Sequence, residues 1–337
     1  MKKLLFLLAV VSLLSGNFFM AQAAQLDTGS GDFNAIRIEE EDRLFIPADK
    51  VNEVWAYLEE YFIKDQTFLE AINPKLSAYF NLEDFRDIYF DTPDLKLLSQ
   101  KSGIRYRVRT NLTNPEDVKN NRELVQIKLN NISANEIQRG EYKYPVKRAG
   151  NINTAEESHP LLGLIDKDFR QEFKDKVSSL GLDPMSLRPI LTVDDHRRRV
   201  YILYDKKPSI SISLDEAKSR VWGQEISFAE IEPEISEIIL TEADEKTKAE
   251  LRNIINKIIG VLKAKLPYLK TDLTPKYNKS FDRLEEKLPY LRALVKYDLQ
   301  SQNALYSVVS LAVLAILALV LGLYFLIKRL VFKQREK

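Results

Sequence analysis

Short segments in which apolar and polar residues alternate recur along most of the chain, and stretches with helical periodicity separate some of them. Alternation with a period of two is typical of strands that bury one face. Strands are predicted near residues 36–46, 86–91, 103–110, 122–130, 138–147, 197–205, 208–216 and 226–236. Helices are predicted near residues 47–62, 162–179 and 241–263. Because strands and helices do not alternate regularly, the pattern favours an antiparallel α+β fold.

Six of the predicted strands share an unusual face of ionisable or hydroxyl side chains. In the strand at 103–110, one face carries Arg105, Arg107 and Arg109 and the other face is apolar, because successive side chains point to opposite sides. A sheet wrapped with its polar face inward, and covered by helices on its apolar face, accounts for the pattern. Eight antiparallel strands are enough to close such a barrel. We therefore expect an α+β fold built on a closed eight-stranded antiparallel β-barrel, or tunnel, with helices outside.

The amino-terminal segment predicts a signal peptide over residues 1–23, followed by a polar leader over 24–35. Lys2 and Lys3 precede an apolar run that ends near Leu14, and small residues follow, which is the order typical of a bacterial signal peptide. An uncleaved membrane anchor is the alternative, although the apolar run is short for a bilayer.

The carboxy-terminal segment predicts one transmembrane helix over residues 304–327. This stretch has no charged residue and is long enough to cross roughly 30 Å of hydrocarbon, although a buried core helix is the alternative. The basic tail at 328–337 favours a cytoplasmic carboxy terminus. Residues 282–303 carry leucines at helical spacing and predict a juxtamembrane helical segment. Together the two ends predict a single-pass membrane protein whose main domain lies outside the cytoplasm, in the periplasm or on the cell surface.

Composition narrows the chemistry available to this domain. The chain has no cysteine and only two histidines, which argues against a disulfide framework, a thiolate nucleophile or a multi-histidine metal site. The signal and the tail carry seven of the 50 basic residues and one of the 49 acidic residues, so the remainder has a net charge of −5. A mildly acidic domain argues against general binding of nucleic acid.

The polar faces bring both signs of charge to the inside of the predicted barrel. Guanidinium groups pair with phosphate oxygens, and clustered carboxylates hold Mg²⁺ or Mn²⁺, which also binds phosphate. Salt bridges alone are the alternative, but so many buried ion pairs are costly without a ligand. The predicted inward charges are Arg43, Arg105, Arg107, Arg109, Lys128 and Arg139 beside Glu39, Glu41, Asp215, Glu230 and Glu232.

An ordered set of motifs over residues 36–281 resembles the CYTH superfamily, the triphosphate tunnel metalloenzymes. The run from Glu39 to Arg43 is similar to the E-x-E-x-K signature of that family, with arginine in place of lysine. Further similar segments are IYFDTPDLKLL at 88–98, YRVR at 106–109, IKL around Lys128, LDEA around Asp215, AEIEPE at 229–234 and PKY around Lys276. Polyphosphate-polymerase domains of the VTC type belong to the same superfamily and are the alternative subfamily.

The resemblance implies a tunnel fold, a divalent cation and roles for individual residues. It implies metal ligation by Glu39, Glu41, Glu230 and Glu232, to which the charge pattern adds Asp215. It implies phosphate contacts from Arg43, Arg107, Arg109, Lys128, Arg197 and Lys276, with Arg198 or Arg199 as alternatives to Arg197; the charge pattern adds Arg105 and Arg139. Glu39, Glu41 and Arg43 are the expected catalytic residues. Two departures, Arg43 for lysine and Lys143 for a second glutamate after Glu141, put the rate of catalysis in question.

Three functions are consistent with these residues. The first is a membrane-anchored, metal-dependent phosphohydrolase acting on tripolyphosphate, polyphosphate or an organic triphosphate, with catalysis by charge neutralisation. The second is a module that binds or senses polyphosphate or another polyanion without turnover. The third is a structural surface protein that keeps only the fold.

Overall fold

The computed structural model describes residues 37–116, 122–133, 136–147, 154–297 and 309–324. The predicted signal peptide at 1–23, the leader at 24–35 and the tail at 328–337 lie outside the described residues, so export stays a prediction.

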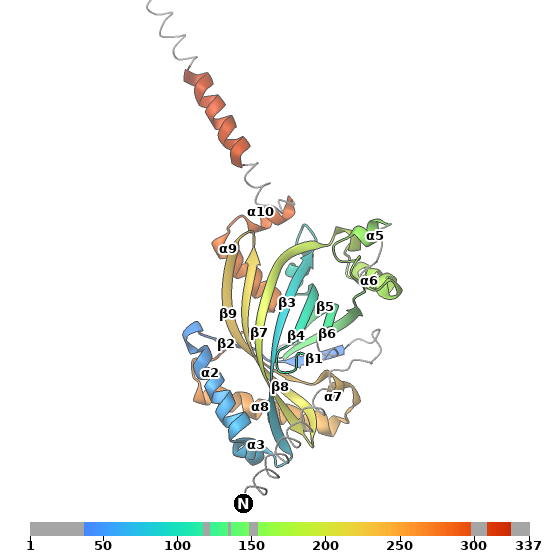
Figure 1. Ribbon diagram of the computed structural model, residues 1–337, viewed down its shortest axis with the longest axis vertical. Helices are drawn as coiled ribbons and strands as arrows, with labels where there is room; N and C mark the ends of the chain where they lie inside the picture. Colours follow the sequence, from blue (N-terminus) through green and yellow to red (C-terminus); the bar gives the residue numbers. More distant parts are fainter. Residues whose placement is uncertain (1–36, 117–121, 134–135, 148–153, 298–308, 325–337) are drawn as a thin grey trace, which may run out of the picture.

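The described residues contain a ten-stranded sheet in which all assigned neighbours are antiparallel (Figure 1). Along the sheet the order is β1-β6-β5-β4-β3-β7-β8-β9-β2-β10, and β1 also pairs with β9. The strands are β1 (Arg37–Glu41), β2 (Leu44–Ile46), β3 (Leu76–Asp91), β4 (Gly103–Asn111), β5 (Arg122–Ser133), β6 (Glu136–Pro145), β7 (Arg188–Tyr204), β8 (Lys207–Val221), β9 (Gln224–Ile235) and β10 (Lys270–Thr271).

Helices cover the apolar face of this sheet. They are η1 (Ala48–Lys50), α2 (Val51–Leu58), η2 (Glu59–Lys64), α3 (Thr67–Ile72), α4 (Lys96–Ser99), α5 (Ala155–Ser158), α6 (Lys167–Ser179), η3 (Pro184–Ser186), α7 (Glu237–Glu242), α8 (Glu245–Lys265), α9 (Lys276–Lys287) and α10 (Leu291–Lys296). Val54 of α2 and Ile258 of α8 pack with Val200 and Ile212 of the sheet in one fully buried cluster. A second cluster joins the sheet to α9 and α10, and a third joins it to α6. The apolar faces of the strands therefore supply the cores, and their polar faces lie on the other side.

The face assignments read from the sequence are confirmed in β4. Ile104 and Tyr106 belong to the apolar cluster beneath α6, whereas Arg105, Arg107 and Arg109 line a cavity on the opposite side of the sheet. The period of two thus sorts apolar residues outward, toward the helices, and charged residues inward.

The prediction of a closed eight-stranded barrel was wrong. Residues 36–46 were predicted as one strand, but the chain turns at Asp42 and Arg43, so β1 and β2 are separate and share the edge of β9. The Asp42 amide donates to the Pro233 carbonyl oxygen within this turn, at 3.0 Å. β1 meets β9 over only two residue pairs, and β2 continues to β10, so the sheet has ten strands rather than eight.

The prediction of a transmembrane helix at 304–327 was also wrong. Within that range the structure describes helix at 309–324, and none of the described helices combines the length and apolarity needed to cross a bilayer. The expected contact with a lipid bilayer is therefore not supported.

The Y-F-D-T-P segment has a structural role that links three elements. Asp91, the last residue of β3, is fully buried, and its carboxylate accepts hydrogen bonds from the backbone amides of Leu97 and Leu98 at the start of α4, both at 2.9 Å. The Tyr277 hydroxyl of α9 donates to the same carboxylate at 3.1 Å. The Tyr277 ring stacks on Tyr89 with 4.9 Å between centroids. This contact fixes the first turn of α9, where Lys276 lies.

Replacing Asp91 should therefore destabilise the fold. Asp91→Ala leaves the backbone amides of Thr92, Leu97 and Leu98 and the Tyr277 hydroxyl without their acceptor, and we expect the free energy of unfolding to fall by about 2–4 kcal/mol. Urea denaturation measures the change. Asp94→Ala removes a largely exposed carboxylate of the same turn and should cost much less; equal losses in the two variants would contradict this role for Asp91.

Candidate functional site

The polar face of the sheet borders one large cavity of about 900 Å³. Strands β3, β4, β5, β7 and β9 and the first turn of α9 all contribute charged or polar side chains to its wall. Nine of the predicted site residues line it: Glu41, Arg43, Arg105, Arg107, Arg109, Lys128, Arg197, Glu232 and Lys276.

Strand register places the central charges in rows across the sheet. Arg197 of β7 is paired with Glu83 of β3 on one side and Asp215 of β8 on the other, and Asp215 is paired with Glu230 of β9. The next row, two residues along each strand, contains Arg199 and Glu232. Because i and i+2 residues share a face, both rows lie on the polar side of the sheet.

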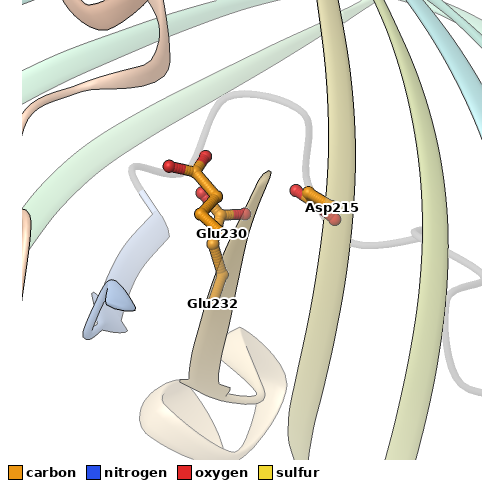
Figure 2. Close-up of side chains that lie close together, drawn as sticks. All are labelled: Asp215, Glu230 and Glu232. Atoms are coloured by element: carbon orange, nitrogen blue, oxygen red, sulfur yellow. The ribbon is translucent and has the colours of Figure 1, made fainter. Parts of the chain in front are cut away.

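Three carboxylates meet where these rows cross β8 and β9. Each of Asp215, Glu230 and Glu232 offers an oxygen within 4.8 Å of the others, and all three are buried (Figure 2). The Arg197 guanidinium donates to Asp215 at 2.6 and 2.5 Å and to Glu232 at 2.9 Å. Arg43 donates to Glu232 at 2.9 Å and to Glu41 at 2.7 Å, which draws the turn after β1 into the same network.

Two lysines of α9 complete the pairing of the acidic cluster. The Lys276 ammonium lies 2.6 Å from Asp195, 2.5 Å from Asp215 and 3.5 Å from Glu230. The Lys279 ammonium lies 2.6 Å from Glu230. Both lysines come from a helix that the sequence analysis did not place at the site, although Lys276 itself was predicted.

A second set of buried carboxylates, on β3, holds the arginines of β4 and β7. Asp87 is fully buried and accepts from Arg107 at 2.6 and 2.7 Å and from Arg105 at 3.0 Å. Glu83, also fully buried, accepts from Arg109 at 2.5 Å and lies 3.8 Å from Arg199. Each of these two carboxylates thus lies against two guanidinium groups.

The ring of Phe85 lies between these two carboxylates along β3. The guanidinium carbons of Arg107, Arg197 and Arg109 lie 4.3, 5.0 and 5.9 Å from its centroid. An aromatic face attracts cations in this way, and it does so without adding a negative charge. Phe85 therefore supports three arginines while leaving their hydrogen-bonding edges for other partners.

Neighbouring charges favour the ionised forms of Glu232, Asp215 and Lys276. Burial would raise the pKa of Glu232, but Lys276 and Arg43 hold it well below its usual range. Burial likewise opposes ionisation of Asp215, and Arg197 and Lys276 lower its pKa. Burial would lower the pKa of Lys276, but Asp195 and Asp215 raise it well above its usual value. Anionic carboxylates and a cationic lysine therefore face one another in the site.

The remaining predicted residues lie on strands β1, β5 and β6. Glu39 and Arg139 are register partners on β1 and β6, and their side chains fall outside the described part of the chain. Lys128 lies 3.7 Å from Glu141. Lys143, the departure noted beside Glu141, lies 2.8 Å from that carboxylate.

Sequence reasoning missed four charges of the network: Glu83, Asp87, Asp195 and Lys279. Glu83 and Asp195 precede the strands predicted at 86–91 and 197–205, so longer predicted strands would have included them. Asp87 falls within the predicted strand at 86–91. Lys279 has no strand pattern to reveal it, because its position depends on how α9 packs.

The donor set fits a divalent cation, with one rearrangement. Three clustered carboxylate oxygens suit Mg²⁺ or Mn²⁺, and Glu230 Oε1 is buried without a hydrogen-bond partner among the described residues. The Lys276 ammonium lies against the same carboxylates, so a cation bound there requires Lys276 to shift toward Asp195.

Residues 61–258 match the family model of the CYTH domain, which covers more than half of the chain. The chain belongs to the CYTH family. The match begins after the E-x-E-x-R segment and ends before α9, so the residues at 39–43 and Lys276 are not part of it.

Several solved structures are similar to this CYTH protein. A candidate adenylate cyclase from Bacillus halodurans shares 17% identity, with 66% of this chain and 90% of that chain covered and a TM-score of 0.34. The Hippeastrum protein HpAC1 shares 15%, with 71% and 93% covered and a TM-score of 0.33. The S. pombe RNA triphosphatase Pct1 shares 13%, with 84% and 92% covered and a TM-score of 0.31. No curated protein sequence matches the chain. Because these sequence identities and TM-scores are low, the family assignment rests on the match to the family model.

The ion pairs of Asp87 with Arg105 and Arg107 predict how the stability of the fold depends on pH. Burial would raise the pKa of Asp87, but Arg105 and Arg107 hold it at about 2, below the ordinary 3.8. A carboxylate whose pKa is lower in the folded protein than in the unfolded chain stabilises the fold at pH values above its unfolded pKa. This contribution is lost as the pH falls through its folded pKa. We therefore expect Asp87 to supply about 2 kcal/mol at pH 5 that is lost near pH 2.

Urea denaturation of wild type and Asp87→Asn at both pH values measures this contribution. The difference in unfolding free energy between the two proteins should shrink by about that amount on acidification. Asp84→Asn, on the outer face of β3, is the matched control. A difference for Asp87→Asn that is the same at pH 5 and pH 2 would show that the arginines do not depress this pKa.

Lys276 should compete with metal for the acidic cluster. Removing its charge in Lys276→Met is expected to tighten Mn²⁺ binding by about tenfold or more, since one buried positive charge no longer opposes the ion. Calorimetric titration of Mn²⁺ without phosphate measures the affinity. Lys287→Met, at the exposed end of the same helix, should leave it unchanged. Unaltered or weaker Mn²⁺ binding in Lys276→Met would refute the competition.

Proposed function

We propose that this CYTH protein is a divalent-metal-dependent hydrolase of triphosphate compounds, with its reaction in the cavity of the sheet. The observation that carries the proposal is the concentration of fixed positive charge on one wall. Arg105 and Arg107 lie against Asp87, and Arg109 and Arg199 lie against Glu83, on this wall of the cavity. A polyanion of several charges is the natural partner for such a wall.

Guanidinium groups suit phosphate because they offer several donors in a rigid plane. The carboxylates of β3 and the ring of Phe85 hold these groups in place before a ligand arrives, so little ordering is needed on binding. As negative charge develops on the transferred phosphoryl group, the same arginines stabilise it, which lowers the barrier to attack by water.

The acidic cluster supplies the complementary half of the site. Asp215, Glu230 and Glu232 would hold the divalent cation, which when bound neutralises phosphate charge and orients its oxygens. Arg197 and Arg43 bridge this cluster to the rest of the cavity by pairing with Glu232. The positions of both arginines therefore depend on a carboxylate that would also ligate the metal.

Binding without turnover is the second candidate function. Arg43 stands where the family signature has lysine, and its guanidinium is fixed by Glu41, Glu232 and the Thr274 carbonyl oxygen. A guanidinium held by three acceptors, and with its pKa raised by Glu41 and Glu232 against the effect of burial, does not exchange a proton near neutral pH. That observation favours a binding or sensing module if no phosphate is released.

The enzyme proposal is tested by incubating the full chain with tripolyphosphate and Mg²⁺ or Mn²⁺ and measuring released phosphate. We expect metal-dependent release, and a fall in kcat of roughly 100-fold or more in Glu230→Gln and Glu232→Gln, since each change removes a metal-ligating charge. Circular dichroism verifies that the variants are folded.

Glu216→Gln is the matched control, because Glu216 follows Asp215 on β8 but points to the outer face, where it pairs with Arg198. Its rate should equal that of the wild type. Equal rates in all three variants would reject catalysis in this cavity, and tight tripolyphosphate binding without release would favour the binding module.

A further inference from the structure

One row of side chains in the cavity differs from the charged rows beside it. Tyr79 of β3 is the register partner of Tyr201 of β7, which is paired with Ser211 of β8, which is paired with Glu234 of β9. All four residues line the cavity. The row thus continues the polar wall of the sheet with two aromatic rings and a hydroxyl in place of arginines.

The row lies at a defined distance from the proposed phosphate site. Tyr201 is two residues from Arg199 and four from Arg197 on β7, which corresponds to roughly 7 and 13 Å along the strand. A phosphate chain held by those arginines would therefore place a group attached to its end beside the tyrosines. This step rests on the proposed function.

The two rings form a stacking platform. Their centroids are 5.0 Å apart and their planes differ by 20°, and both residues are half-buried. Arg199 extends the arrangement, because its guanidinium carbon lies 5.3 Å from the Tyr201 centroid and it donates to the Tyr201 hydroxyl at 2.8 Å. The platform is therefore connected directly to the arginines that would hold phosphate.

Ser211 provides a polar contact in the same row. Its hydroxyl is buried, the residue is only 5% exposed, and among the described residues the hydroxyl has no hydrogen-bond partner. The other serines of β8 differ. Ser209 donates to the Lys207 carbonyl oxygen, Ser213 accepts from Arg199, and Ser219 donates to Ser280. A buried hydroxyl in a cavity without a partner in the protein is suited to a ligand atom.

The cavity wall also contains apolar side chains near these strand ends. Leu203 and Pro208 flank the tyrosine row on β7 and β8, and Ile235 and Ile238 follow Glu234. Apolar side chains give a phosphate group no compensation for the hydration that it would lose against them, and Lys206, the lysine of this turn that lines the cavity, is exposed to solvent. These apolar surroundings suit an organic group.

We propose that Tyr79, Tyr201 and Ser211 form a specificity subsite for a planar aromatic group joined to the triphosphate, as in a nucleoside triphosphate. The rings stack on the planar group, and the Ser211 hydroxyl hydrogen-bonds to one of its polar atoms. An inorganic chain would use the arginines but not this row.

The test compares the affinities of the full chain for adenosine triphosphate and for tripolyphosphate, both with Mg²⁺, by calorimetry. In the wild type we expect adenosine triphosphate to bind about tenfold more tightly, within the range of base–aromatic stacking. Tyr79→Leu should bring the ratio of the two dissociation constants close to one. Ser211→Ala should reduce the ratio by roughly threefold, as for one lost hydrogen bond.

Tyr204→Leu is the matched control, since Tyr204 lies on the same strand but bonds to Glu250 outside the cavity. It should keep the wild-type ratio. Equal affinities in the wild type, or a ratio unaltered by Tyr79→Leu, would overturn the subsite even if both compounds are hydrolysed. If neither is hydrolysed, the proposed hydrolase fails while the ratio still decides the subsite. Absence of binding by both compounds would overturn both proposals.

Discussion

The pairing of buried carboxylates with buried cations is the interaction on which the rest of this structure depends. Asp87 and Glu83 hold the arginines of β4 and β7, and the cluster at Asp215 holds Arg197 and Lys276. Desolvation makes such pairs a weak source of stability, and a core of apolar residues would often be as stable. The apolar clusters between sheet and helices instead stabilise the fold, which leaves the inner face available for ions.

The separation of the apolar clusters from the charged inner face of the sheet explains how one protein can carry so many buried charges. The long strands of the sheet contribute alternate residues to two environments, so the core and the site are built from the same sheet without competing for positions. α9 connects the two. Tyr277 and Phe281 pack in the apolar cluster, while Lys276 and Lys279 reach the carboxylates from the same helix. The packing of Tyr277 and Phe281 against the sheet therefore determines where the charges of Lys276 and Lys279 lie.

The alternation of apolar and polar residues along the strands predicted which side chains line the cavity. It did not predict where a strand is interrupted by a turn or how a helix docks. The arginines at 105, 107 and 109 were placed correctly because parity within a strand requires no tertiary knowledge. The turn at Asp42 and Arg43 was missed because the residues on either side continue the alternating pattern, so β1 and β2 were predicted as one strand. The contribution of Lys279 depends on helix docking, which the pattern of one strand cannot reveal.

The central claim is that the cations held by β3 form a site for phosphate. A crystal structure of the full chain with tripolyphosphate and Mn²⁺ tests it most directly. We expect phosphate oxygens within hydrogen-bonding distance of Arg107, Arg109 and Arg199, with these guanidinium groups still held by Asp87 and Glu83. Tripolyphosphate bound elsewhere on the protein, with the arginines paired only to carboxylates, would contradict it.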